Sequence, residues 1–261
     1  MLDFPNSPTV GQIFSGPKGT FSWDGVKWVP VTTAGFGDAP SDGNSYARKN
    51  GAWSAIAGTL VAFNVYSSSQ TITIPAGATK AVVELWGGAG GSGNASSGSG
   101  QMVGCGGGGA GGYLVKSLSG LTAGNTLIYT QGAAGAGGPI VPYAAHDGGP
   151  GGASSLASGT QTISTLTANG GAGGINAWNA GNGTAGGVGG TATGGDLNIS
   201  GAAGQKGLID SSDTANFDFM GGNGGVTMYS RGGNGLGFGS SVSPTVGNPG
   251  TSGGMIIRWF S

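Results

Sequence analysis

The sequence predicts a mainly β protein: an antiparallel β-sandwich with inserted glycine-rich polyglycine-II helices, preceded by small β-hairpin N-terminal modules. Apolar stretches of strand length alternate with glycine tracts, and glycines recur three residues apart within those tracts. Near the N-terminus, aromatic residues flank an Asp-Gly and an Asn-Gly pair, as they do in short hairpins. We therefore divide the chain into hairpin modules at 1–57, made of 1–31 and 32–57, and a glycine-rich domain at 58–261.

Glycine sets the character of the second domain, since it supplies 63 of the 261 residues. In the long tract 169–254 it recurs with a spacing of three, as at Gly183, Gly186 and Gly189. About three residues per turn is the period of the extended polyproline-II helix, which has no hydrogen bonds of its own. Because buried backbone groups must be paired, we expect such helices to bond laterally in a bundle. Disorder is the alternative, whereas collagen would need an unbroken Gly-X-Y repeat and more proline.

The stretches between the glycine tracts are predicted strands. In 80–86, strict alternation places Ala81, Val83 and Leu85 on one side and the other residues, including Glu84, on the opposite side. The last strand has no neighbouring partner in the sequence, so we expect it to join a sheet built from residues 60–129. The predicted strands are 60–66, 71–74, 80–86, 113–118, 126–129, 161–167 and 255–260.

Two related units make up the N-terminal modules. In the first, Trp23 and Trp28 flank Asp24-Gly25, a pair that supplies the positive φ of a two-residue type I′ turn. The second repeats the pattern around Asn50-Gly51. Each hairpin is too small to be stable alone, so we expect both to dock on a partner or on copies of themselves; a plain linker of hairpins is the alternative. The candidate attachment residues are Phe4, Phe14, Trp23, Trp28, Tyr46 and Trp53.

Composition argues against several classes of function. Charged residues make up 7% of the chain and the net charge is −1, so nothing predicts nucleic-acid binding. No apolar window is long enough for a membrane helix, and the N-terminus lacks the pattern of a secretory signal. His146 is the only histidine and Glu84 the only glutamate, which leaves little material for catalysis, and we expect no cofactor and no metal site. The aspartates of 210–218 could hold Ca²⁺ or a sugar, but a solvated loop fits them better.

Some side chains are too bulky for a bundle of glycine helices, and they gather between the glycine runs. They must cap the bundle, pack on the sandwich or face a partner. Loops on a rigid scaffold commonly bind partners, and aromatic and Arg side chains dominate binding energy. We favour Trp178 and Tyr229 most. The candidate receptor-binding residues are Tyr143, His146, Trp178, Phe217, Phe219, Met228, Tyr229 and Arg231.

The N-terminal fifth of the chain resembles a known group of proteins. FPNSPTVGQIF followed by WDGVKWVP resembles the opening of many tailed-phage fibre and tail-appendage proteins, and DAPSDGNSYARKNGAW is similar to a short unit that recurs in them. In that family such units lie in the virion-proximal part of a fibre. The resemblance implies attachment to other tail or baseplate proteins.

The rest of the chain resembles the glycine-rich domain of phage tail proteins, through TITIPAGATKAVVELWGGAGG, GGGGAGGYLVKSLSGLTAGNTLIYTQGAAG and GGMIIRWF. The same order of features occurs in receptors of the anaplastic-lymphoma-kinase class. Tip adhesins of T-even-like phages carry a polyglycine-II bundle whose end loops contact the host receptor. The resemblance implies a non-enzymatic, homotrimeric protein of the virion tail, synthesised in the host cytoplasm, that binds an outer-membrane protein or glycan. A purely structural virion protein and a polysaccharide depolymerase are the alternatives.

Overall fold

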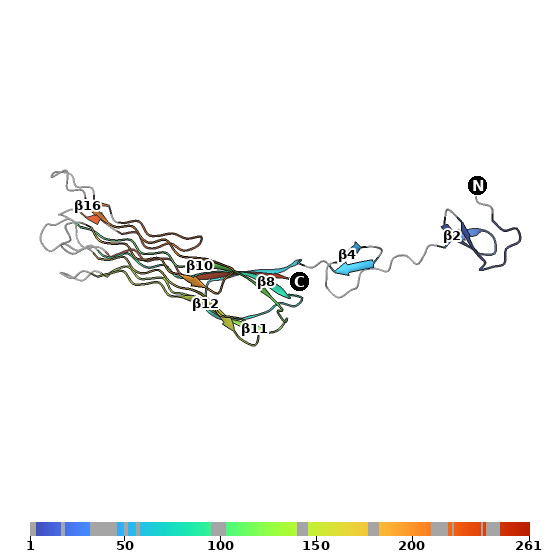
Figure 1. Ribbon diagram of the computed structural model, residues 1–261, viewed down its shortest axis with the longest axis horizontal. Helices are drawn as coiled ribbons and strands as arrows, with labels where there is room; N and C mark the ends of the chain where they lie inside the picture. Colours follow the sequence, from blue (N-terminus) through green and yellow to red (C-terminus); the bar gives the residue numbers. More distant parts are fainter. Residues whose placement is uncertain are drawn as a thin grey trace. The chain divides into compact units, whose positions relative to one another are not determined.

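The chain forms two compact units, Met1–Ile56 and Ala57–Ser261, in a computed structural model (Figure 1). The described part of the chain contains no helix, and therefore none long and apolar enough to cross a membrane. Its strands pair antiparallel, as the sequence predicts. The structure describes residues 4–16, 19–31, 46–49, 52–55, 58–94, 103–139, 146–176, 183–209, 219–220, 222–235, 237–238 and 246–261.

The first unit contains the predicted hairpins. Strands β1 (Ile13–Gly16), β2 (Gly19–Trp23) and β3 (Trp28–Pro30) form one sheet in that order. Strands β4 (Tyr46–Lys49) and β5 (Ala52–Ala55) pair with each other. Each arrangement is built from strands of three to five residues.

The turn between β2 and β3 differs from the predicted two-residue turn. Trp23 and Trp28 are the last paired residues, so the loop includes all residues between them. Within it only Gly25 has a positive φ, of 103°. The Asp24 carboxylate accepts hydrogen bonds from the N–H groups of Val26 and Lys27, both at 2.8 Å. A side chain thus supplies acceptors that close a longer loop, as Asp commonly does in turns.

The second unit begins with a β-sandwich of two five-stranded sheets. One sheet has the order β15-β10-β8-β19-β6 and the other the order β14-β13-β12-β11-β7. In the first sheet the strands are β6 (Leu60–Tyr66), β8 (Lys80–Trp86), β10 (Tyr113–Ser119), β15 (Leu197–Ile199) and β19 (Gly254–Phe260). In the second they are β7 (Gln70–Thr73), β11 (Thr126–Thr130), β12 (Ser154–Ser158), β13 (Leu166–Ala168) and β14 (Ala192–Thr193).

The predicted alternation along β8 is confirmed. Val83 and Leu85 are fully buried between the sheets, in a core that also contains Leu114, Leu127 and Trp259. The last strand, β19, lies between β8 and β6 and pairs with both, as the sequence predicts. Residues at both ends of the unit therefore build one sheet.

The predicted strand at 161–167 is wrong in its position. The strand is β13, which begins only at Leu166, and the sequence analysis missed its partner β12. The residues between them form a loop because side chains bond to its backbone. The Ser158 hydroxyl donates to the Ile163 carbonyl at 2.9 Å and accepts the Ile163 N–H at 3.0 Å. These bonds replace a strand ladder.

The glycine tracts form a bundle of extended segments that run side by side from the sandwich (Figure 1). In segment 87–94, every third N–H, starting at Gly87, donates to a carbonyl of 104–112 at 2.9 to 3.3 Å. The next N–H of each triplet donates to 146–153, and the third to 246–253. A period of about three is that of polyproline II, so the predicted lateral bonding is present. The segments are 87–94, 104–112, 131–139, 146–153, 169–176, 183–191, 200–207, 222–225, 231–235 and 246–253.

Two central segments, 87–94 and 104–112, are hydrogen-bonded to each other and surrounded by the others. All their described side chains and glycines are buried. The further partners of the first are 131–139, 146–153, 169–176, 231–235 and 246–253. Those of the second are 169–176, 183–191, 200–207, 222–225 and 231–235.

Glycine is needed in the bundle for space and not for an unusual backbone. Among the described bundle glycines only Gly183 has a positive φ. A Cβ built on Gly108 would lie 2.0 Å from the carbonyl oxygen of Gly90, and one on Gly137 would lie 1.7 Å from that of Gly247. A side chain is thus excluded at these glycine positions.

The glycine pattern of each segment follows the number of its packed sides. In the peripheral segment 200–207 only Gly201, Gly204 and Gly207 are buried or half-buried, and the side chains of the residues between them are exposed. The long tract 169–254, which has the clearest spacing of three, therefore supplies the periphery. The centre comes from the first insertion, where nearly every residue is Gly, Ala, Ser or Cys.

Candidate functional site

The end of the bundle away from the sandwich, the far end, is where the candidate site lies. The bundle segments run from the sandwich to this end (Figure 1). Segment 87–94 starts directly after β8, so its last residue, Asn94, lies at the far end. The stretches of this unit that the structure leaves undescribed are flanked by residues that are bonded to one another at this end. The longer of these stretches are 95–102, 140–145, 177–182, 210–218 and 239–245.

Asn94 joins three segments at the far end. Its side chain is fully buried. The Asn94 amide donates to the Pro139 carbonyl at 2.7 Å and its carbonyl oxygen accepts the His146 N–H at 2.8 Å, while the Asn94 N–H donates to the His146 carbonyl at 3.0 Å. The backbone groups on both sides of 140–145 are therefore held by one side chain.

Two further polar side chains fix the neighbouring segments. One Asp147 carboxylate oxygen accepts both the backbone N–H of Asn176, at 2.8 Å, and its side-chain amide, at 2.7 Å. The Thr184 hydroxyl donates to the Ile175 carbonyl at 2.8 Å and accepts the Gly106 N–H at 3.1 Å. These side chains replace the inter-segment bonds that end with the bundle.

Two short strand pairs flank the remaining stretches. Strand β9 (Val103–Gly104) pairs with β18 (Gly237–Phe238), and β16 (Leu208–Ile209) pairs with β17 (Phe219–Met220). The two pairs lie next to each other, because β16 and β17 both contact β9. The far end therefore has a framework that holds the start and the finish of each stretch.

Three predicted receptor-binding residues, Tyr143, Trp178 and Phe217, lie outside the described residues. Phe219 lies in β17, and its side chain is likewise outside the description. His146 is half-buried beside Asn94, and its Nε2 is buried with no hydrogen-bond partner in the described part of the chain. The structure thus places His146 and Phe219 at the far end.

Met228, Tyr229 and Arg231 are not brought together with His146. They belong to a tight turn, closed by a bridge between Val226 and Arg231, at the sandwich end of the bundle. The Tyr229 ring lies 4.6 Å from that of Trp86 and 6.0 Å from that of Tyr113. The predicted residues therefore separate into two locations at opposite ends of the bundle.

The predicted attachment residues of the first unit form an aromatic cluster. The Phe4 ring stacks on Trp28 at 5.2 Å and lies 5.0 Å from Phe14, and Trp23 lies 5.6 Å from Trp28. All four are only partly buried. Tyr46 and Trp53 lie in β4 and β5, and nothing is described of their side chains.

The sequence analysis missed Asn94, Asp147, Asn176 and Thr184. Their position in the sequence could have identified them, since each is a short polar residue at the boundary of a glycine run. Such residues hydrogen-bond readily to nearby backbone. In the described residues no three His, Cys, Asp or Glu side chains gather as a metal site would require. The arrangement fixes the described residues on either side of these stretches with a carboxylate, amide and hydroxyl groups and backbone groups.

Residues 64–260 match a protein-family model described as a glycine-rich domain. A comparison with curated proteins finds no match. Because the family model covers most of the chain, the protein belongs to this glycine-rich domain family.

Proposed function

We propose that the protein is a non-enzymatic bacteriophage tail fibre or tail-tip protein that binds a host-cell surface receptor through the far end of its bundle. The observation that carries this proposal is the shared position of the described residues that flank the undescribed stretches. By sequence they contain Tyr143, Trp178 and Phe217, and their flanking residues are bonded together at one end. Aromatic side chains on loops of a rigid scaffold are typical binding elements.

The same proposal assigns residues 1–57 to attachment, on other tail or baseplate proteins of the virion. Near the start of the second unit, the Gly58 N–H donates to the Ser261 carbonyl at 3.0 Å. This start lies at the end of β6 and β19 opposite the bundle. The start and the far end are thus separated by the whole sandwich and bundle. We further propose that copies made in the host cytoplasm assemble in the tail as a homotrimer.

Receptor binding is tested by adsorption of particles that carry Trp178→Ala together with Tyr143→Ala. We expect the adsorption rate to fall at least about tenfold, since an aromatic hot spot contributes roughly 2 kcal/mol or more. Val188→Ala is the matched control, because Val188 is 71% exposed on the side of the bundle. Unchanged adsorption of the double variant, with normal incorporation, would contradict the proposal.

Attachment is tested separately by removing residues 1–57. Particles should then lack the protein, while the remaining chain should still bind cells. Normal incorporation would overturn the attachment role. Particles that lack the whole protein and still adsorb normally would instead favour a purely structural virion component, and turnover of host surface glycan by the purified protein would favour a depolymerase.

A further inference from the structure

The outer face of the sheet β15-β10-β8-β19-β6 is apolar, and within its unit the turn at Tyr229 covers it only at the bundle end, over Trp86 and Tyr113. Phe63 and Val65 of β6 are 53% and 60% exposed, and Leu197 and Ile199 of β15, on the opposite border, are 50% and 42% exposed. Exposed apolar patches of this extent mark interaction sites in soluble proteins. Strand β6 is also an open edge, since within the described residues it pairs only with β19.

The charges in the middle of this face neutralise each other. Glu84 is 8% exposed, accepts a hydrogen bond from the Tyr113 hydroxyl at 2.8 Å and forms an ion pair with Arg258. Arg258 in turn lies over the Phe63 ring, 5.6 Å from its centroid. A face whose central charges are already paired can meet a second copy of itself without repulsion between like charges.

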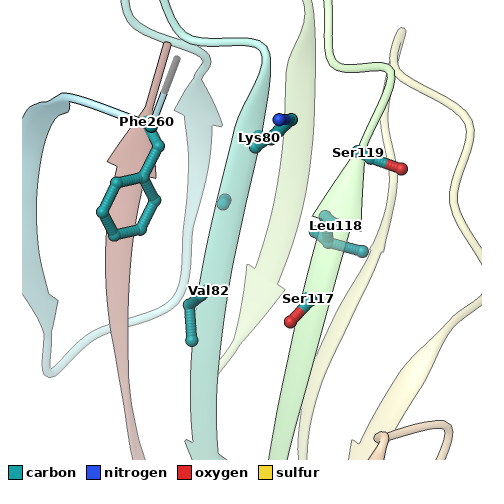
Figure 2. A pocket seen from close by; sticks show the side chains of 8 residues that line it. Lys80, Val82, Ser117, Leu118, Ser119 and Phe260 are labelled. Carbon is teal, nitrogen blue, oxygen red and sulfur yellow. The ribbon is translucent and has the colours of Figure 1, made fainter. Parts of the chain in front are cut away.

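A hollow lies on the same face at the end near Gly58. It has a volume of about 260 Å³. Figure 2 shows that its lining comes from three adjacent strands, with Phe260 on β19, Val82 on β8 and Ser117 on β10. Phe63 lies at the same level as the hollow, that is, at the same position along the strand direction. The register shows this, because it pairs Phe63 with Arg258, Arg258 with Val82, and Val82 with Ser117. The face thus carries a protruding ring at one border and a hollow at the same level.

The size of the face suits association of copies. Four of its strands are seven residues long. At about 4.8 Å between strands and about 3.3 Å per residue, they present roughly 450 Å² in flat projection. Side-chain relief and the turn at Tyr229 add to this area, which brings it to the order of 600 Å² per partner at the lower end of stable interfaces.

We propose that this face packs against a second copy of the chain, with the copies related by an axis parallel to the strands. Such an axis keeps the levels of the two sheets aligned, so Phe63 of one copy meets the hollow of the next. Pairing of two β6 edges would instead be antiparallel and would point the two bundles in opposite directions. The choice of axis rests on the proposed function, which requires all far ends to point the same way.

The interface is tested first by the mass of the purified chain in solution. Light scattering should give a multiple of 24.9 kDa for the wild type and a single chain for Val65→Asp/Leu197→Asp. Ile128→Asp is the matched control, because Ile128 is 44% exposed on the other sheet, and it should stay associated. A monomeric wild type, or an associated double variant with unchanged circular dichroism, would overturn the proposal.

The axis is tested by disulfide formation between differently substituted chains. Val65 and Leu197 share one level on opposite borders, so a Val65→Cys chain should cross-link to a Leu197→Cys chain. A Ser119→Cys chain, whose residue lies at another level, should not cross-link to Val65→Cys. Cross-linking of Val61→Cys to Val65→Cys would show antiparallel edges and refute the axis.

A monomeric chain in particles that still adsorb would refute the interface alone, and normal adsorption by associated loop variants would refute only the proposed function. A cross-link from this face to a different tail protein would identify that protein as the occupant and overturn the proposal.

Discussion

The sandwich and the bundle of the second unit exclude water in opposite ways, and the change occurs within a few residues. Val83 and Leu85 of β8 are buried by the side chains of the opposite sheet. Gly87 and Gly88 follow almost directly and are also buried, yet they contribute no side chain. In the sandwich, apolar side chains fill the space between layers. In the bundle, the backbones approach so closely at most glycines that a Cβ has no room.

The difference shows why the two parts are joined as they are. A peptide hydrogen bond contributes only about 1 kcal/mol net, and glycine loses more conformational freedom on ordering than any other residue. The bundle therefore gains when its segments start in fixed positions. Most segments continue directly from a strand of the sandwich, as 87–94 does from β8 and 104–112 does into β10. The sandwich thus aligns the backbones that the bundle bonds together.

The largest expected effect comes from removing a core side chain. Trp259 is fully buried, and its indole N–H donates to the Asn64 side chain at 3.0 Å. Trp259→Ala should lower the free energy of unfolding by about 3–5 kcal/mol. Because the sandwich aligns the bundle, hydrogen exchange at bundle amides should accelerate by the factor that corresponds to this loss of unfolding free energy. Ile128→Ala, at a half-exposed site, serves as control. Unchanged exchange in the bundle would show that it is stable without the sandwich.

A methyl group placed in the bundle should have the next largest effect. Gly108→Ala puts a Cβ 2.0 Å from the Gly90 carbonyl oxygen, and the segments must separate to admit it. We expect a loss of roughly 2–3 kcal/mol, as for overpacking of a core. At Gly149 the nearest atom to an added Cβ is 3.2 Å away. Gly149→Ala should therefore lie within about 1 kcal/mol of the wild type. Urea unfolding measures the free energy of unfolding of both variants. Equal losses for Gly108→Ala and Gly149→Ala would contradict the close packing of the segments as the cause.

Alkaline pH should affect the sandwich through Tyr129, because the peptide groups of the bundle do not titrate there. Burial raises the pKa of Tyr129 to about 12 from its ordinary value of 10.0. The folded state therefore loses stability as the pH rises above the unfolded value, by about 1.4 kcal/mol per pH unit up to about pH 12. Thermal unfolding should show a smaller alkaline decline for Tyr129→Phe. Equal alkaline declines in the thermal stability of the wild type and Tyr129→Phe would show that Tyr129 is not the cause.

The sequence predicts how the sandwich and the bundle are each held together, but it does not predict which bundle segments are neighbours. Alternation in β8 predicts its buried side, and the spacing of glycines predicts lateral bonding. The separation of Tyr229 from His146 follows from direction, because each segment reverses the previous one and 226–231 falls at a return to the sandwich. The interruptions look alike in the sequence, which does not show at which end of the bundle each one lies. The capping role of Asn94 depends on which segments are neighbours, and strand order decides that.

The smallest effect tests a charge on the boundary between the two parts. Burial favours the neutral form of Glu84, but hydrogen bonds from Arg258 and Tyr113 outweigh it and hold its pKa below the ordinary 4.5. Its stabilising effect is therefore present above that value and is lost as the pH falls through the folded pKa. Glu84→Gln should cost roughly 1–2 kcal/mol near pH 7, and less in acid.

Asp196→Asn is the matched control for that experiment. It removes the ion pair with Lys116 at the exposed edge of the same sheet, and such solvent-exposed pairs contribute little to stability. The difference in unfolding free energy between wild type and Glu84→Gln should stay constant near neutral pH and shrink over the acidic range, as the pH falls through 4.5 toward the folded pKa of Glu84. A difference that stays constant over this range would mean that Glu84 stabilises the sheet through its shape and its hydrogen bonds, and not through its charge.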